Sequence, residues 1–257
     1  MGGYNVKEYS LIDSSEVILN GVPCIYIKPN FINGDLPTVL LYHGWSSNKE
    51  NFKFIGTVLA QNGFQVIVPD AVDHGVRASL DYENILIMKE NFWRVVFETV
   101  NESKGLIDEA VKVLGINENK IAVMGSSMGG FICSGIFTRN KNVKCIINMN
   151  GASAWENSEY HFRRLHNLNF ATEEQMAYIK ENDPLRFKGT FNPRGILLLH
   201  GDSDTQVSIE TQRYFYNEVK GTYMDSNNLQ LIESPGLDHY KTVRMLEESI
   251  DWLNRFI

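Results

Sequence analysis

Six continuous apolar runs of strand length are the feature of this sequence that most restricts its fold. They cover residues 38–42, 65–68, 120–124, 143–148, 196–200 and 229–232. Strands of a parallel sheet are buried on both faces and are therefore apolar throughout, whereas half-exposed strands alternate. Helix-compatible stretches separate the runs, and the last of them repeats apolar residues on one helical face at Val243, Leu246, Ile250, Leu253 and Ile257. The pattern predicts an α/β fold with a mostly parallel sheet and helices on both faces.

Two further stretches complete the expected architecture. The dipeptide Asn20-Gly21 separates strand-like runs at 17–19 and 22–27, which predicts an antiparallel hairpin. Residues 84–114 are too long for an average helix and contain Gly105, which favours two helices or one bent helix.

Residues 151–188 interrupt the alternation, because they contain no strand-like run. The stretch is helix-compatible from Glu173 to Lys180, and the Asp183-Pro184 pair ends it. An insertion at this point would lie over the carboxyl edge of the sheet, so we expect a small cap. An ordinary crossover helix with long loops is the alternative. Trp155 and His161 are candidates for lining a pocket, although cap aromatics equally form a core of their own.

A Gly-x-Ser-x-Gly element at residues 125–129 follows the apolar run at 120–124. A stretch of small residues at 127–138, compatible with a helix, follows it. Between a strand and a helix such a serine occupies a strained turn, and flanking glycines remove the Cβ atoms that would clash. We therefore predict Ser127 as a nucleophile. Ser126 is the rival, but it lacks a glycine two residues before it.

A serine hydroxyl is a poor nucleophile at neutral pH unless an imidazole takes its proton and a carboxylate orients the imidazole. His239 follows the run at 229–232 through a flexible loop and is the only histidine after the candidate acids. Asp204 is the favoured acid, because it lies in a Gly-x-x-Asp-x-x-Val pattern where the chain leaves a strand. Asp202 is the alternative acid and would otherwise shape the turn. The neighbouring Asp238 is expected to be a helix N-cap.

Stabilising a tetrahedral oxyanion requires two preorganised donors. The backbone amide of Met128, directly after the serine, is one candidate. The loop after residues 38–42 should supply the second, and Trp45 is the predicted donor. His43 in the same loop is expected to hold the loop by hydrogen bonds rather than to transfer protons.

Composition excludes several classes of protein. The net charge is −7, from 24 basic and 31 acidic residues, which argues against nucleic acid as a partner. The six histidines are scattered, so no metal site is expected, and three cysteines without framework spacing suggest reduced thiols. No apolar run approaches the roughly 20 residues of a membrane span. The first residues lack the pattern of a signal peptide, and Val6 stands where myristoylation needs Ser or Thr. We expect a cytoplasmic protein with a single domain over 1–257.

Taken together, these segments resemble the α/β-hydrolase superfamily. Within it they are most similar to small bacterial esterases related to prolyl-oligopeptidase catalytic domains and dienelactone hydrolases. The matching pieces are Tyr42-His43-Gly44-Trp45, Pro69-Asp70 with His74-Gly75, the element at 125–129, His200-Gly201 with Asp204 and Val207, and His239. The resemblance implies an eight-stranded, mostly parallel sheet, a Ser127–Asp204–His239 triad, no cofactor and carboxylic-ester hydrolysis. Two departures matter: there is no room for a propeller domain, and the elbow carries Ser rather than the Cys of dienelactone hydrolases.

The expected function is that of a carboxylesterase-like serine hydrolase (EC 3.1.1 class), acting on small-molecule esters through an acyl-enzyme. Short-chain or small aromatic acyl groups are favoured, because the predicted cap mixes charged residues with its aromatics whereas a lipase lid presents a broad apolar face. A peptidase or aminopeptidase would use the same triad, with Glu156 or Glu159 as the anchor for a charged terminus. A thioesterase or acyltransferase differs only in leaving group or acceptor. A non-catalytic binding module is disfavoured by the complete triad, and a dehalogenase or lyase by the absence of Asp at the elbow.

Overall fold

The computed structural model describes residues 11–32, 34–78 and 80–257, so the expectations about the first six residues fall outside it. The strands are β1 (Ile12–Leu19), β2 (Val22–Pro29), β3 (Thr38–Tyr42), β4 (Gln65–Pro69), β5 (Ile121–Ser126), β6 (Val143–Met149), β7 (Gly195–Gly201) and β8 (Leu229–Ser234). The α-helices are α1 (Lys49–Gln61), α2 (Ile85–Leu114), α3 (Met128–Arg139), α4 (Trp155–Leu165), α5 (Glu173–Asn182), α6 (Ile209–Val219) and α7 (Val243–Phe256). Three short 3-10 helices span Pro184–Thr190, Lys220–Thr222 and Ser226–Asn228.

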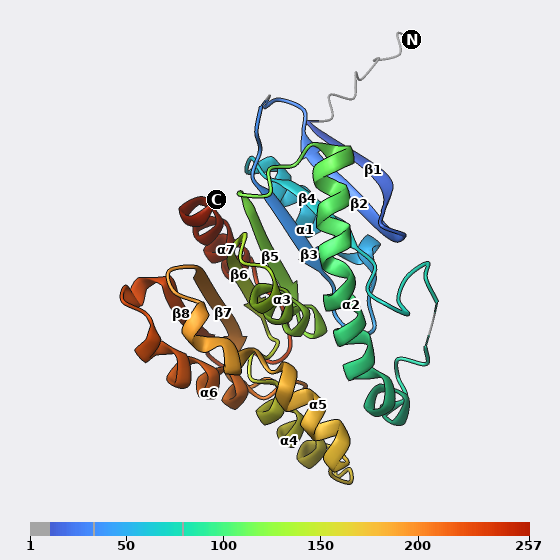
Figure 1. Cartoon of the computed structure of the whole chain (residues 1–257), viewed down its shortest axis with the longest axis vertical. Coiled ribbons are helices and arrows are strands. Elements are labelled where there is room, and N and C mark those ends of the chain that lie inside the picture. Colours follow the sequence, from blue (N-terminus) through green and yellow to red (C-terminus); the bar gives the residue numbers. More distant parts are fainter. Residues whose placement is uncertain (1–10, 33, 79) are drawn as a thin grey trace, which may run out of the picture.

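The eight strands form one sheet in the order β1-β2-β4-β3-β5-β6-β7-β8 (Figure 1). The pairs β1–β2 and β2–β4 are antiparallel, and all the other pairs are parallel. Each of the six apolar runs becomes a strand, and the hairpin turns at Asn20-Gly21, where both residues have positive φ. The mostly parallel α/β architecture expected from the sequence is confirmed.

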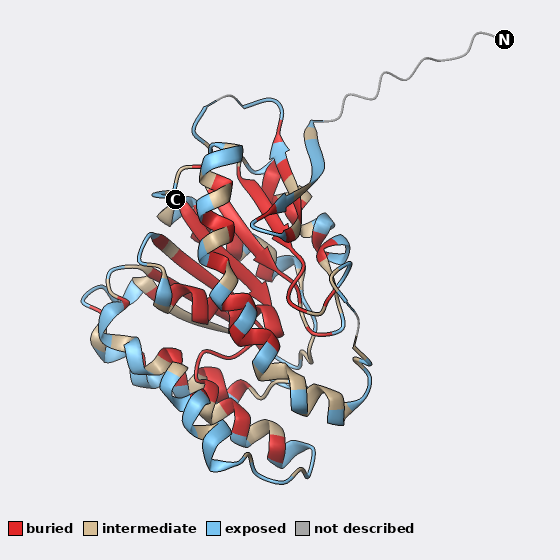
Figure 2. Cartoon of the chain, turned by 45° about the vertical axis from the view of Figure 1, so that its right-hand side comes forward, coloured by how far each residue is buried: buried red, intermediate tan, exposed pale blue. Residues whose placement is uncertain are grey.

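Helices cover both faces of the sheet and form two separate apolar cores. Side chains of α1 and α7 pack with Val39 and Leu41 of β3 on one face. Side chains of α2, α3 and α6 pack with Leu40 and Tyr42 on the other. The central strands are consequently buried along their length (Figure 2). Full burial of one such aliphatic side chain stabilises the fold by about 1.5–3 kcal/mol.

Residues 85–114 form one continuous helix, α2, with Asn84 as its N-cap, so of the two expected alternatives the one with two helices is wrong. Gly105 does not end the helix but allows a close contact with the β1–β2 turn. A Cβ atom at Gly105 would lie 2.2 Å from Nδ2 of Asn20. The glycine therefore marks the place where the helix packs against the hairpin, and not a break between helices.

The expected insertion is helical in the structure. Helices α4 and α5 and the 3-10 helix at Pro184–Thr190 connect β6 to β7, and α4 and α5 lie beyond the carboxyl ends of the strands (Figure 1). Asp183, which follows α5, accepts hydrogen bonds from the backbone of Glu156 at 2.8 Å and of Leu185 at 2.8 Å. Its carboxylate thereby connects the end of α5 to the first turn of α4.

Among the helices of the described residues, none has a stretch both long and apolar enough to cross a membrane.

Candidate active site

Ser127 occupies a strained turn between β5 and α3. Its φ of 57° and ψ of −123° lie in a region that L-residues rarely adopt. The two flanking glycines are required by close backbone contacts. A Cβ at Gly125 would lie 2.2 Å from the carbonyl oxygen of Gly129, and one at Gly129 would lie 2.3 Å from that of Tyr42. Ser126, the rival serine, is the buried last residue of β5.

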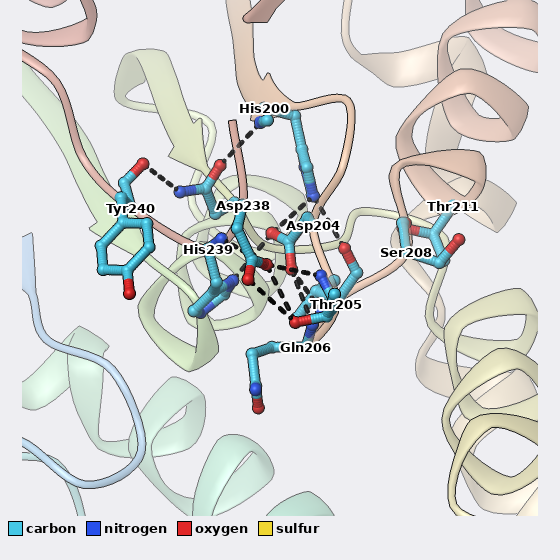
Figure 3. A network of polar contacts seen from close by, with 12 residues as sticks. His200, Asp204, Thr205, Gln206, Ser208, Thr211, Asp238, His239 and Tyr240 are labelled. Carbon is cyan, nitrogen blue, oxygen red and sulfur yellow. Dashed lines mark hydrogen bonds and ion pairs between the residues drawn. The ribbon is translucent and has the colours of Figure 1, made fainter. Parts of the chain in front are cut away.

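Asp204 and His239 meet at the carboxyl ends of β7 and β8. Nδ1 of His239 lies 2.7 Å from Oδ2 of Asp204 (Figure 3). The Asp204 side chain is fully buried, whereas that of His239 is 23 % exposed. Burial disfavours the charged carboxylate, but hydrogen bonds from His200 and His239 outweigh it and hold the pKa of Asp204 below its ordinary value. An ionised Asp204 keeps the His239 proton on Nδ1, so Nε2 is the basic nitrogen.

His200 approaches the same carboxylate oxygen and was given no role from the sequence. Its Nε2 lies 3.1 Å from Oδ2 of Asp204 and 2.9 Å from the carbonyl oxygen of Val207 (Figure 3). Both neighbours are acceptors, so the ring carries its proton on Nε2. The available sequence signal was a histidine at a strand end, four residues before the candidate acid.

Two aspartates close to the Asp204–His239 pair, Asp202 and Asp238, hold loops. Oδ1 of Asp202 accepts from the Gly236 amide at 2.7 Å, which fits the turn-shaping role expected if it is not the acid. Oδ1 of Asp238 accepts from the amides of Thr205 at 2.7 Å and of His239 at 2.8 Å. The predicted N-cap role of Asp238 is wrong: Thr242 caps α7, because the chain continues past Asp238 before the helix begins.

The loop after β3 lies directly against the serine. A Cβ at Gly44 would be 3.2 Å from Cβ of Ser127, which leaves the next residue, Trp45, beside the elbow. Met128 begins α3, so its amide belongs to the first-turn donors that have no partner within the helix.

His43 is buried within this loop and holds it in place. Its Nε2 accepts from the Ala71 amide at 3.1 Å, and Nδ1 lies 2.8 Å from the carbonyl oxygen of Gly44. Burial lowers the pKa of His43 to about 3, so the ring is neutral near pH 7. These contacts agree with the expected loop-holding role.

One open cavity of about 1140 Å³ brings the predicted residues together: Trp45, Ser127, Met128, Asp204 and His239 all line it. Within the described ranges no hydrogen bond joins Oγ of Ser127 to His239; such bonds often form only when substrate is bound. Eight aromatic residues contribute to the walls, namely Trp45, Phe52, Tyr82, Phe92, Trp93, Phe131, Phe162 and Tyr240.

The two candidate pocket residues of the insertion have different positions. His161 lines the cavity. Trp155 is fully buried in the core instead, with its ring centroid 5.5 Å from those of both Trp93 and Phe97. The pocket role considered for Trp155 is therefore wrong. Among the residues that the structure describes, no three His, Cys, Asp or Glu side chains are grouped to hold a metal ion.

The sheet order, the strained serine and the polar groups at the carboxyl edge define a member of the α/β-hydrolase superfamily. Sequence comparison gives the family: the model of the prolyl oligopeptidase family (Peptidase_S9) matches residues 98–257. This match covers well over half of the chain, so the protein belongs to that family. The family is one of esterase-like serine hydrolases.

Two bacterial proteins resemble the chain in sequence, and a solved structure resembles it in fold. YitV of Bacillus subtilis is 24 % identical over 259 residues, which cover 96 % of this chain and 100 % of YitV. Esterase YjfP of Escherichia coli is 26 % identical over 227 residues, which cover 86 % of this chain and 90 % of YjfP. Among solved structures, the acylaminoacyl peptidase of Pyrococcus horikoshii superposes with a TM-score of 0.78 at 17 % identity, over 100 % of this chain and 44 % of the peptidase.

Proposed function

We propose that this protein hydrolyses carboxylic esters of short-chain or small aromatic acyl groups through an acyl-enzyme. Ser127 is the nucleophile, His239 the general base and Asp204 the residue that orients the base. The observation that carries the proposal is the 2.7 Å contact between His239 and Asp204 beside the strained Ser127 in one cavity. The similarity to Esterase YjfP supports an ester as the substrate.

The proposed reaction is acyl transfer in two steps. Nε2 of His239 accepts the Ser127 proton as Oγ attacks the ester carbonyl, and the amides of Trp45 and Met128 hydrogen-bond the oxyanion. The alcohol then leaves with the proton from His239, and water attacks the acyl-enzyme by the same route. Each oxyanion donor would contribute about 3 kcal/mol to stabilising the transition state.

The helices α4 and α5 are proposed to act as a small cap that helps to select the substrate. The residues of α4 that line the cavity are Ser158, Glu159, His161, Phe162, Arg164 and Leu165, so this wall mixes charged and polar groups with apolar ones. A wall of this kind supports small or aromatic acyl groups better than a long aliphatic chain lying along α4.

A peptidase function is the second candidate, favoured by the family and by the likeness to acylaminoacyl peptidase. An aminopeptidase needs a free carboxylate for a charged amino terminus. Both oxygens of Glu159 are already engaged, one by Trp93 and the other by Arg163. Glu156 does not line the active-site cavity, and its Oε1 lies 3.7 Å from Nζ of Lys180. Neither carboxylate is therefore well placed to anchor a charged amino terminus in the cavity, which supports the ester.

Labelling with a fluorophosphonate probe and kinetics with p-nitrophenyl esters test this proposal. We expect an adduct on Ser127 and its loss in Ser127→Ala and His239→Ala. Either substitution should lower kcat by about 10⁶-fold, since residues that act as a unit lose nearly everything together. Turnover should be highest from acetate to butyrate, and aminoacyl-arylamides should be poorer substrates.

Paired variants of the two aspartates serve as the control. Asp204→Asn should strongly reduce kcat, whereas Asp202→Asn should retain most of it. The reverse result would identify Asp202, and not Asp204, as the acid. Undiminished esterase activity in Ser127→Ala would falsify the assignment of the nucleophile.

A further inference from the structure

A second cavity of about 300 Å³ lies behind the active-site cavity, between α2, α4 and α5. It shares three lining residues with the active-site cavity: Lys89, Trp93 and Glu159. Its remaining apolar walls come from Phe97, Tyr178 and Ile179, and the other lining residues are polar or charged: Glu90, Arg94, Glu98, Asn101, Arg163 and Gln175.

The Trp93 indole stands between the two cavities and is fixed there. Its Nε1 donates a hydrogen bond to Oε2 of Glu159 at 2.8 Å. The other oxygen of Glu159 accepts from Nε of Arg163, and both of these side chains are 5 % exposed or less. Arg163 in turn donates to the carbonyl oxygen of Asn169 at 2.6 Å. The ring is therefore held by a buried ion pair of α4.

Aromatic rings extend from the nucleophile to the second cavity. Phe131 lies one helical turn after Ser127 in α3 and lines the active-site cavity. The centroid of Trp93 lies 5.8 Å from that of Phe131 and 5.7 Å from that of Phe97. Phe97 then contacts Tyr178 at 4.6 Å in the second cavity. An acyl chain that followed this apolar path from Ser127 would meet the indole before it reached the second cavity.

We propose that Trp93 is the wall that limits acyl-chain length on this side, and that the second cavity becomes a subsite for an aliphatic acyl chain when the indole is removed. This inference rests on the proposed esterase function and adds a specificity-determining residue to it.

The test compares p-nitrophenyl esters from acetate to dodecanoate in the native protein and three variants. Trp93→Ala should raise the ratio of kcat/KM for decanoate to that for acetate by about tenfold or more, since each buried methylene contributes about fourfold. Trp93→Phe loses the hydrogen bond to Glu159 but keeps a ring, so its chain-length profile should stay close to that of the native protein. Tyr160→Ala, the matched control, removes an exposed aromatic side chain of α4 that lines neither cavity, and it should not produce the gain at decanoate.

An unchanged chain-length profile in Trp93→Ala would overturn the inference, and so would an equal gain in Trp93→Phe or Tyr160→Ala. Trp93→Leu replaces Trp93→Ala if the smaller residue prevents folding.

Calorimetric binding of decanoate to Ser127→Ala, with and without Trp93→Ala, gives a readout that needs no turnover. Tighter binding in the double variant supports the wall, and equal binding contradicts it. Failure of the esterase proposal would appear separately, as absent turnover of every ester by the native protein.

Discussion

All the acceptor positions of the Asp204 carboxylate are occupied. Oδ1 accepts from the amides of Gln206 at 2.8 Å and Val207 at 2.9 Å, and Oδ2 accepts from His239 and His200. An ionised carboxylate offers about four such positions. A buried charge is tolerated only when it is compensated in this way. His200 therefore supplies one quarter of the hydrogen bonds that keep the acid ionised, and it acts through Asp204 rather than on substrate.

Replacing His200 tests this role. His200→Leu should lower kcat for p-nitrophenyl acetate about 10- to 100-fold, because a hydrogen bond to a buried charged group contributes about 1.5–3 kcal/mol. Loss of that bond raises the pKa of Asp204. On acidification, the variant should therefore lose activity at a higher pH than the native protein. His200→Gln retains a donor near Nε2 and should recover most of the rate and the native pH profile. An unshifted profile in His200→Leu would mean that the histidine is only structural.

Helix α4 depends on a residue outside itself for its N-terminal cap. Its own N-cap is Ala154, whose methyl group cannot accept a hydrogen bond. Asp183 supplies the acceptor for the amide of Glu156 instead. Burial raises the pKa of Asp183 to about 6, although the backbone hydrogen bonds oppose the rise. The contact between the end of α5 and the first turn of α4 therefore depends on the protonation state of this one carboxyl group.

The pH dependence of stability follows from this raised pKa. The folded-state pKa is about 6 against an ordinary 3.8, so the contribution to stability is fully present below about pH 4 and is lost as pH rises through 6. The loss should amount to about 3 kcal/mol. Chemical denaturation at pH 4 to 7 should show native stability falling by this amount relative to Asp183→Asn, which cannot titrate. Parallel curves for the two proteins would contradict the expectation.

At the scale of the whole molecule, the sequence predicts the sheet better than it predicts contacts between helices. Strands buried on both faces must be apolar throughout, so all six parallel strands could be located. The order of Ser127, Asp204 and His239 could be assigned because each follows such a strand. The contact between Trp93 and Glu159 joins residues 66 positions apart and leaves no periodic signal. For the same reason the sequence could not decide between a pocket and a core position for Trp155, or between one helix and two at Gly105.

The separation of the two cores by the sheet has a measurable result. Ile136 of α3 and Leu253 of α7 are fully buried on opposite faces. Ile136→Val should lower the free energy of unfolding by about 0.5–1.5 kcal/mol and Leu253→Ala by about 2–5 kcal/mol. Urea denaturation of the double variant should give the sum within about 0.5 kcal/mol, because the sites share no partners. A larger deviation would show that strain passes through the sheet.

The position of α4 and α5 in the chain has an evolutionary consequence. The three residues proposed for catalysis follow β5, β7 and β8, whereas these helices join β6 to β7. If α4 and α5 select the substrate as proposed, exchange of this one contiguous segment would alter which substrates are accepted and leave Ser127, Asp204 and His239 unchanged. Proteins that descend from one ancestor can in this way come to differ in substrate while they keep the same catalytic residues.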